Sequence, residues 1–158
     1  MIRKLSINDL SAVKETFFNS FSAEEAPITY PVIKSVIEED ATNNNYCIGY
    51  ELDGKIVSGF SPVFFKSDNE ISAYILAPLA THQSHKKKGL ATKLIESAKA
   101  YFSKNGVDAL LVYGDPKYYG RYGFNADLGK HFVPPYPLEY DFGWQALMLN
   151  ALSDAALW

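Results

Sequence analysis

The sequence predicts a mixed α/β fold, with helices on the faces of one central sheet. In the middle of the chain an apolar strand, a lysine-rich turn, a long amphipathic helix and a second apolar strand follow one another. A hairpin pattern just before them adds antiparallel strands. The chain has 158 residues and no linker or repeat divides it, which predicts a single domain over residues 1–158.

The first two helices are predicted from apolar spacing and a capping signal. A short strand is expected at residues 2–5, and residues 6–9 carry the start signal of the helix that follows. Apolar side chains recur at helical spacing through residues 10–21. The second helix is expected over residues 32–40.

A β-hairpin is predicted after the polar break that ends the second helix. Residues 46–52 and 55–65 flank Asp53-Gly54, a pair that supplies the positive φ of a tight turn. A further strand is expected at residues 71–80. Because Pro78 cannot donate a hydrogen bond to a sheet, we expect a bulge or a splayed edge there.

The second half of the chain predicts a long helix and two more strands. Apolar side chains recur at helical spacing over residues 90–104, and Asn105-Gly106 ends the pattern. A strand buried on both faces is expected at residues 109–113. After an irregular, aromatic stretch beyond Phe124, residues 143–149 form the last expected strand.

The turn at residues 86–91 has the pattern of an anion-binding loop. It joins a strand to the first turn of a helix, where unpaired backbone N–H groups can converge on a phosphate. Gly89 allows close approach of the backbone, and three adjacent lysines add positive charge. The alternative is a plain helix start behind a solvated turn, since neither of the common nucleotide-binding glycine motifs is present.

Composition and charge argue against several classes of protein. The net charge of −3 gives no general attraction to nucleic acid or to an anionic membrane, so the lysines are a local feature. No apolar run reaches the roughly 20 residues that span a bilayer, and the N-terminus lacks a signal-peptide core, so we expect a cytoplasmic protein. Cys47 is the only cysteine and is expected to be buried, and no metal site is expected.

Three segments resemble the GNAT superfamily of acyl-CoA-dependent N-acyltransferases, and the match extends over nearly the whole chain. The cofactor signature of that family, Gln/Arg-x-x-Gly-x-Gly/Ala, corresponds to Lys86, Gly89 and Ala91. Residues 76–82 are similar to its bulged fourth strand, and residues 119–124 to its Tyr-x-x-x-Gly-Phe segment. The longer string around that last segment is especially similar to a bacterial subgroup of small predicted N-acetyltransferases. The resemblance implies a mostly antiparallel central sheet with helices on both faces and a splayed fourth strand.

The resemblance also implies an acetyl-CoA-dependent enzyme with two catalytic groups. The backbone N–H of Leu79 would stabilise the oxyanion, and the phenol of Tyr119 would protonate the departing thiolate. Tyr118 and Tyr122 are rival candidates for the acid, and each tyrosine could instead pack at the rim of the core. The residues implied in cofactor binding are Leu79, Ala80, Thr81, Lys86, Lys87, Lys88, Gly89, Leu90, Ala91 and Thr92.

Two departures from the family pattern bear on this site. Lys86 replaces the usual glutamine or arginine, which loosens a side-chain contact with phosphate but leaves the backbone loop intact. Asp115-Pro116 stands where family members often have an asparagine and a fuller helix. Asp115 therefore serves either as a helix cap or in catalysis, and Pro116 suits the first turn of a short helix.

The sequence does not identify the group that removes the proton from the amine. Tyr74 and Ile75 occupy the positions near which many family members carry a glutamate. Glu70, His82 and His85 are the nearby candidates, and bulk water is an alternative.

For two further segments the sequence leaves more than one role open. Residues 132–144 concentrate aromatic and acidic side chains, which either receive a cationic amine or cover the sheet or a dimer contact. Residues 151–158 could form a short docking helix.

Together these patterns predict an N-acetyltransferase that moves an acetyl group from acetyl-CoA to a primary amine by direct attack in a ternary complex. One alternative is a non-catalytic acyl-CoA-binding or sensor module of the same fold. A second, less favoured, is a nucleic-acid-binding module that uses the lysine loop. The expected partner is a small-molecule or peptide amine, and a homodimer stays open. Neither nucleic acid nor a membrane is an expected partner.

Overall fold

The computed structural model describes residues 1–43, 46–66, 70–135 and 137–149, and its centre is a six-stranded sheet. The strands are β1 (Ile2–Lys4), β2 (Ile48–Leu52), β3 (Lys55–Phe65), β4 (Ala73–Thr81), β5 (Ala109–Tyr113) and β6 (Trp144–Met148). They are hydrogen-bonded in the order β1-β2-β3-β4-β5-β6. β4 and β5 are parallel, whereas the β1–β2, β2–β3 and β5–β6 pairs are antiparallel. The expected mixed, mostly antiparallel sheet is confirmed.

The helices lie between the strands in the chain. The α-helices are α1 (Leu10–Ser20), α2 (Ala26–Asn43), α3 (Leu90–Lys104), α4 (Pro116–Tyr119) and α5 (Ala126–Gly129). Short 3₁₀ turns are η1 (Ile7–Asp9), η2 (Gln83–His85), η3 (Gly120–Tyr122) and η4 (Asp141–Gly143). Among the residues described, no helix combines the length and the apolar character needed to cross a membrane.

The chain divides into two compact units, and each is described by itself. The first unit comprises Met1–Pro62 and Pro78–Ile95. The second unit comprises Val63–Ala77 and the residues from Glu96 onward. The loop before α3 therefore belongs to the first unit, and α4 with its tyrosines belongs to the second.

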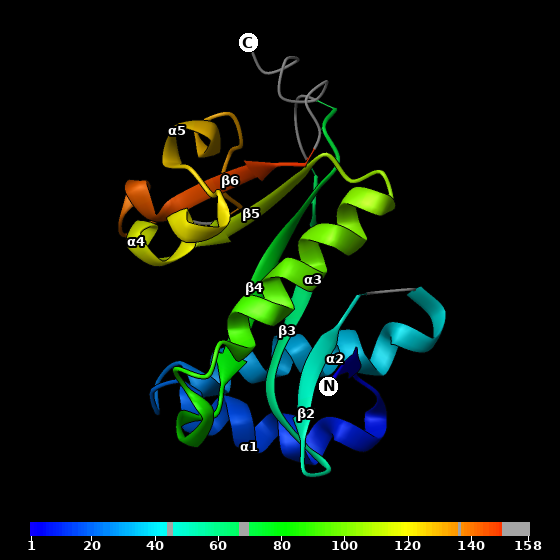
Figure 1. Cartoon of the computed structure of the whole chain (residues 1–158). Coiled ribbons are helices and arrows are strands. Elements are labelled where there is room, and N and C mark those ends of the chain that lie inside the picture. The colour runs from blue at the N-terminus through cyan, green and yellow to red at the C-terminus, as the bar shows by residue number, and fades with distance from the viewer. Residues whose placement is uncertain (44–45, 67–69, 136, 150–158) are drawn as a thin grey trace. The chain divides into compact units, whose positions relative to one another are not determined.

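The core of the first unit joins its two N-terminal helices to the sheet. In Figure 1, α1 and α2 lie on one side of β2 and β3, and the first turns of α3 lie on the other. Cys47 is 0% exposed, and its Sγ lies 3.4 Å from the carbonyl oxygen of Phe60. The expectation of a buried cysteine is confirmed. The residues of this core are Leu5, Val13, Phe17, Ile33, Ile37, Cys47, Ile56 and Ala80.

The hairpin between β2 and β3 has the turn that its sequence predicts. Asp53 has φ 50° and Gly54 has φ 80°, and Leu52 pairs directly with Lys55 across the turn. Two successive positive φ values match the right-handed twist of the flanking strands.

The second unit is built around the parallel pair β4–β5. The pairs run from Ala73–Ala109 to Ile75–Leu111, whereas β5 continues to pair with β6 as far as Tyr113. The described β4–β5 pairs end at Ile75–Leu111, and the bulge or splayed edge expected at Pro78 stays a prediction. The core of this unit comprises Phe65, Ile71, Ala73, Ile75, Ala109, Leu111, Phe132, Trp144 and Ala146.

Two expectations about helices are wrong. The second helix begins at Ala26 and not at residue 32, and it continues through Pro31, although proline lacks the N–H that a helix interior uses. Its Ile33 and Ile37 are 0% and 3% exposed, so core packing outweighs the local penalty. The chain after Phe124 is also not irregular at once, because α5 follows there. The expected helix at residues 151–158 lies outside the described residues.

Candidate active site

The loop between β4 and α3 leads directly into the start of a long helix. After η2, Lys86 is extended with φ −67° and ψ 156°, and α3 begins at Leu90. The N–H of Lys93 donates to the carbonyl of Gly89 at 3.1 Å, which makes Gly89 the residue just before the helix. The N–H groups of the first turn have no partner one turn earlier in a helix. Such a helix start can bind an anion.

Two residues in this loop have left-handed backbone conformations. Lys87 has φ 64° and Gly89 has φ 76°. Alternating backbone conformations of this kind form the concave groups of N–H donors that bind anions in other proteins. A Cβ added at Gly89 would meet no protein atom within 4 Å, so the glycine is not needed for packing. It serves the positive φ, and the space beside it is open to a ligand.

The predicted cofactor-binding side chains of this loop are mostly exposed. Lys86, Lys87, Lys88 and Gly89 are all exposed, as is Thr92. Leu90 is buried and Ala91 is half-buried, which fixes the first turn of α3 in the first unit. The Nζ of Lys88 lies 3.2 Å from the Nδ1 of His85. The loop therefore presents local positive charge on a backbone that packing holds in place.

The end of β4 is fixed by a residue that the sequence analysis missed. Ser58 on β3 is 0% exposed, and its hydroxyl donates to the carbonyl of Ala80 at 3.0 Å. The same Oγ lies 2.8 Å from the Oγ1 of Thr81. Leu79, the predicted oxyanion donor, is half-buried in this last part of the strand. A serine between apolar residues in a predicted strand carries no sequence signal for this role.

The predicted acid, Tyr119, lies in a short helix directly after β5. Asp115 caps this helix, because its Oδ1 accepts from the N–H of Lys117 at 2.9 Å. Its carbonyl accepts from the N–H of Tyr119 at 3.0 Å. The structure thus places Asp115 as the helix cap. The ring of Tyr119 packs against those of Tyr118 and Phe124, with centroids 4.9 and 5.9 Å away.

The three tyrosines of this segment differ in environment. Burial raises the pKa of Tyr119 above its ordinary value, and the neighbouring Tyr122 adds to the shift. Burial and the hydroxyl of Tyr122 at 3.5 Å also raise the pKa of Tyr118. The guanidinium of Arg121 lies 4.7 Å from the ring centre of Tyr118 and 5.5 Å from that of Tyr122. The phenol of Tyr119 is therefore protonated over the neutral range.

In the second unit, the positions around the expected carboxylate hold packed side chains. The ring of Tyr74 stacks on Phe102 with centroids 4.7 Å apart, and Ile75 is 6% exposed in the core. Glu70 is exposed and has φ 60°. Neither side chain supplies a carboxylate at these positions.

The two candidate histidines lie in the first unit, beside a polar hollow. The hollow has a volume of about 180 Å³, and its lining includes His82, His85, Glu15 and Lys55. The Nδ1 of His82 accepts from the N–H of Ser84 at 3.2 Å, and the Ser84 hydroxyl lies 2.7 Å away. One ring nitrogen of His82 is thus already occupied. The described residues contain no group of three or more side chains suited to hold a metal ion.

The aromatic segment at residues 132–144 divides into buried and exposed parts. Phe132 and Trp144 are 2% and 3% exposed, and the indole N–H of Trp144 donates to the carbonyl of Phe132 at 2.9 Å. These two rings cover the sheet. Tyr140 and Phe142 are 54% and 59% exposed, with ring centroids 5.5 Å apart. Tyr136 lies outside the described residues.

The comparison with protein families identifies the chain. Residues 1–126 match the family described as Acetyltransferase (GNAT) domain. The chain belongs to the GNAT acetyltransferase family. The expected resemblance is confirmed, and membership classes the chain as an acyltransferase. The sequence motif and the loop geometry point to the same segment of the GNAT domain, between β4 and α3.

Individual relatives agree with this GNAT assignment. The uncharacterized N-acetyltransferase YjhQ of Escherichia coli (strain K12) is 26% identical over 151 residues, which cover 91% of this chain and 81% of that protein. A GNAT family N-acetyltransferase (YhbS) from Escherichia coli in complex with CoA matches with a TM-score of 0.78 and 23% identity, over 99% of this chain and 83% of that one. A GNAT family acetyltransferase from Brucella melitensis in complex with acetyl-CoA has a TM-score of 0.70 and 20% identity, over 95% and 88%. These structures show the shared GNAT fold.

Proposed function

We propose that this GNAT chain is an acetyl-CoA-dependent N-acetyltransferase that acetylates a primary amine. The observation that carries the proposal is the loop of residues 86–92, in which positive φ at Lys87 and Gly89 precedes the first turn of α3. A diphosphate fits this loop, because it carries concentrated negative charge and accepts several main-chain hydrogen bonds. The CoA and acetyl-CoA complexes of two fold neighbours support the same ligand class.

The end of β4 also contributes to donor binding, after the loop that holds the diphosphate. The backbone of Leu79, Ala80 and Thr81 pairs with the extended arm of the donor, and Ser58 keeps this part of the strand in place. The N–H of Leu79 donates to the thioester oxygen as negative charge develops on it. A preorganised donor of this kind contributes about 3 kcal/mol to transition-state stabilisation in comparable sites.

Tyr119 completes the proton balance of the transfer. The amine nitrogen forms a bond to the thioester carbon, the carbon–sulfur bond breaks, and the departing sulfur takes the phenolic proton of Tyr119. Because its pKa is raised, the tyrosinate left behind is a strong base. It recovers a proton from the acetylated nitrogen, directly or through water. The acceptor first loses its ammonium proton to water or to another base, and the cycle then returns Tyr119 to its neutral form.

The acyl group passes directly from donor to amine, without an acyl-enzyme. Cys47 is the one thiol of the chain, and it is 0% exposed in the core of the first unit. A sealed thiol cannot attack a thioester. Donor and acceptor therefore bind together in a ternary complex.

The acceptor is a cationic amine that binds at the exposed part of the aromatic segment. Tyr140 and Phe142 present ring faces to solvent, and the exposed Glu139 and Asp141 flank them. Within the described residues neither carboxylate forms a salt bridge. Aromatic faces and carboxylates both attract an ammonium group.

The test combines binding and turnover. Calorimetry with acetyl-CoA measures donor binding, and release of the CoA thiol measures turnover with a panel comprising spermidine, lysine, an aminoglycoside and a peptide with a free N-terminus. We expect donor binding together with amine-dependent thiol release. Binding without turnover on any amine would instead favour the sensor module.

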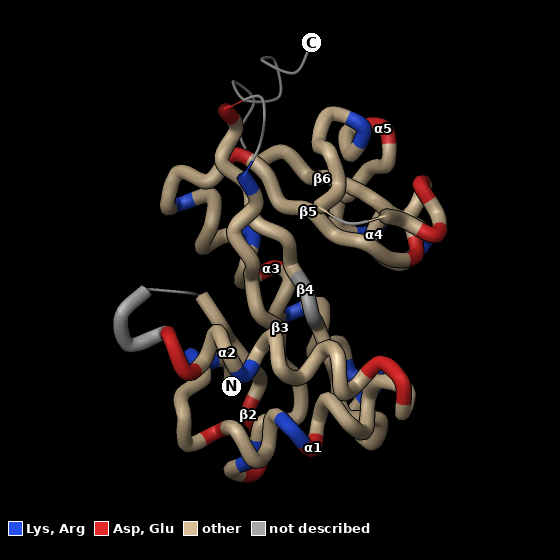
Figure 2. The backbone as a smooth tube through the Cα atoms, turned by 180° about the vertical axis from the view of Figure 1, so that it is seen from behind, with Lys and Arg blue, Asp and Glu red and all other residues tan. Residues whose placement is uncertain are grey.

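The nucleic-acid alternative gives a different result in the same assays. Figure 2 shows basic and acidic residues interspersed along the backbone of each unit, so the lysine loop is a local charge. A nucleic-acid module would bind an oligonucleotide with an affinity that falls steeply with salt, and CoA would not displace it. The expected cytoplasmic location stays a prediction.

A further inference from the structure

We infer that Gly114 is a positioning residue for Tyr119, because the space left by its missing side chain is occupied by the phenol ring. Gly114 is the residue that follows β5, and Tyr119 ends the helix α4 drawn in yellow after that strand in Figure 1. The inference rests on the proposed role of Tyr119 as the acid. It concerns what places the hydroxyl, which neither the family match nor the motif specifies.

The contact between the two residues leaves no room for a methyl group. A Cβ built on Gly114 would lie 2.5 Å from the Cε2 of Tyr119, 3.1 Å from Cδ2 and 3.6 Å from Cζ. Cε2 and Cζ are the ring atoms next to and bearing the hydroxyl. Any residue other than glycine would therefore displace the edge of the ring that carries the hydroxyl.

Glycine is not required at this position by the backbone. The glycines with positive φ are Gly54, Gly89, Gly106 and Gly123, and Gly114 is not among them. An alanine could adopt the same backbone conformation without strain. For an alanine Cβ, the three nearest heavy atoms all belong to the ring of Tyr119.

Hydrogen bonds hold the backbone on both sides of the contact and oppose a shift that would relieve the collision. The N–H of Gly114 donates to the carbonyl of Gly143 at 3.0 Å, and its carbonyl accepts from the Nε2 of Gln145 at 3.1 Å. Gln145 is 1% exposed. The N–H of Tyr119 is bonded to the carbonyl of Asp115 at 3.0 Å. The collision is therefore relieved mainly by rotation of the Tyr119 side chain about its torsions. This rotation moves the hydroxyl.

Ring packing is what holds the hydroxyl in place. Within the described residues the Tyr119 hydroxyl has no hydrogen-bond partner, and its ring neighbours are Gly114, Tyr118 and Phe124. Without a hydrogen bond to the hydroxyl, the position of the oxygen is set by the packing of the ring. The position of the proposed acid therefore depends directly on the absence of a side chain at Gly114.

The experiment measures Gly114→Ala by activity and by stability. With acetyl-CoA and an amine that turns over, we expect kcat to fall about 10- to 100-fold, while the Kd for acetyl-CoA stays within about twofold, as for a misplaced catalytic group. Gly120→Ala is the matched control in the same segment, since Gly120 has φ −57° and an added Cβ would meet no atom within 4 Å. The kcat of this control should change less than about threefold, because the proposed acid keeps its position.

Two double variants separate positioning from general damage. If Gly114 acts through the phenol, adding Gly114→Ala to Tyr119→Phe lowers kcat no further than Tyr119→Phe alone. In thermal unfolding, Gly114→Ala lowers the Tm of the wild type, and it lowers the Tm of Tyr119→Ala by less, a partial recovery that reflects the removed collision. This recovery tests the contact even if Tyr119 proves not to be the acid.

The inference is overturned if Gly114→Ala keeps the wild-type kcat, or if its loss adds fully to that of Tyr119→Phe. It is also overturned if Tyr119→Ala gives no recovery of Tm. Failure of the proposed function gives another pattern, in which Tyr119→Phe leaves the rate unchanged while the recovery of Tm is still observed.

Discussion

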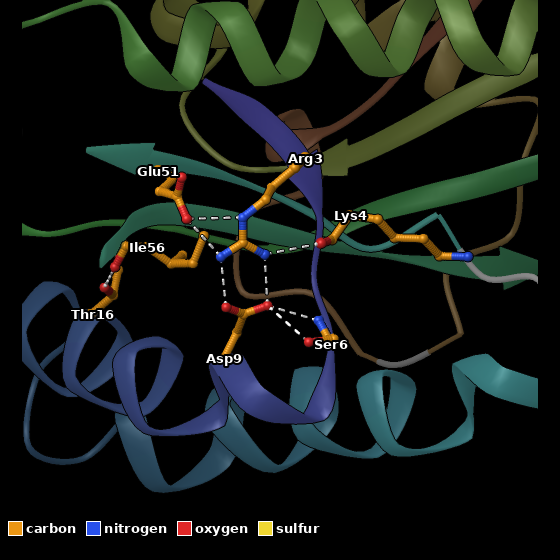
Figure 3. A network of polar contacts seen from close by, with 7 residues as sticks. All are labelled: Arg3, Lys4, Ser6, Asp9, Thr16, Glu51 and Ile56. Atoms are coloured by element: carbon orange, nitrogen blue, oxygen red, sulfur yellow. Dashed lines mark hydrogen bonds and ion pairs between the residues drawn. The ribbon is translucent and has the colours of Figure 1, made fainter. Parts of the chain in front are cut away.

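Arg3 and Asp9 form a two-bonded ion pair at the start of the fold. The Nη1 of Arg3 donates to the Oδ2 of Asp9 at 2.8 Å, and Nη2 donates to Oδ1 at 2.7 Å (Figure 3). The Nε of the same guanidinium donates to Glu51 at 3.1 Å, and the N–H of Ser6 donates to Asp9 at 2.8 Å. One arginine thus links β1, β2 and the turn that leads into α1.

Asp9→Asn should destabilise the protein by about 2 kcal/mol, because charge-assisted hydrogen bonds contribute about 1.5 to 3 kcal/mol and Asp9 is largely buried. Urea unfolding measures the change. Glu38→Gln is the control, since Glu38 pairs with Lys34 at 3.9 Å on an exposed helix face. That change should stay below about 0.5 kcal/mol. Equal losses in the two variants would contradict the assignment.

The same pair predicts how stability depends on acid. The guanidinium of Arg3 lowers the pKa of Asp9, with a further contribution from the Ser6 N–H. A lowered folded-state pKa gives stability that is complete above the ordinary aspartate value of about 3.9 and is lost as the pH falls through the folded value. The stability difference between wild type and Asp9→Asn should therefore be constant near neutral pH and shrink below about pH 4. A difference that persists unchanged at pH 2 would refute this origin.

Gly89→Glu should abolish binding of acetyl-CoA in calorimetry. The substitution adds a negative side chain where we place the diphosphate, and it forces an L residue into φ 76°. Gly106→Glu is a closely matched control, because Gly106 has φ 77° and open space around its added Cβ. Both variants carry a backbone strain of about 1 kcal/mol or more. Only Gly89→Glu should lose the donor, and normal binding by it would misplace the diphosphate site.

Tyr119→Phe should lower kcat about 100-fold or more and leave the Kd for acetyl-CoA nearly unchanged, as expected when a general acid is removed. Tyr118→Phe is the control, and it should cost much less. Because the pKa of Tyr119 is raised, the wild-type rate should persist to a pH above the ordinary phenol value of about 10 before it falls. That alkaline fall should disappear in Tyr119→Phe. A phenylalanine variant with wild-type turnover would remove the assignment.

Asp141→Asn should raise the KM for a cationic amine several-fold, and kcat should change little. Asp141 is exposed and stands between Tyr140 and Phe142 in the sequence, and its carboxylate would attract an ammonium group. Asp127→Asn is the control, because Asp127 is exposed in the same unit and pairs with Lys130 at 3.3 Å. A KM that rises equally in both variants would indicate a general effect of charge.

Much of the fold could be predicted from the sequence where local chemistry decides the structure. Asp53-Gly54 needs positive φ at both positions, and the hairpin follows from that need. The bounds of α3 follow from its apolar spacing and from Asn105-Gly106. The start of α2 could not be predicted, because burial of Ile33 and Ile37 in a core formed by distant segments outweighs the effect of Pro31.

In the candidate site, too, some features could be predicted from the sequence and others could not. The helix start at Gly89 could be predicted, because glycine and the strand-turn-helix order both indicate it. The positive φ of Lys87 could not, since lysine rarely adopts that conformation. The contact between Gly114 and Tyr119 depends on side-chain torsions. The hydrogen bond from Ser58 to Ala80 joins two residues that are 22 positions apart in the sequence and lie on different strands. Neither leaves a periodic signal along the chain. The prediction of a single domain stays a prediction.

Because Cys47 is buried, acetyl transfer can be measured with a reagent that detects free thiols. A colorimetric disulfide reagent reacts with thiolates that it can reach, and the one protein thiol is enclosed with 0% exposure. Colour that develops in a mixture of folded enzyme, donor and amine therefore counts liberated coenzyme without a protein background. When denaturant is added in place of the amine, the same reagent reports opening of the first unit.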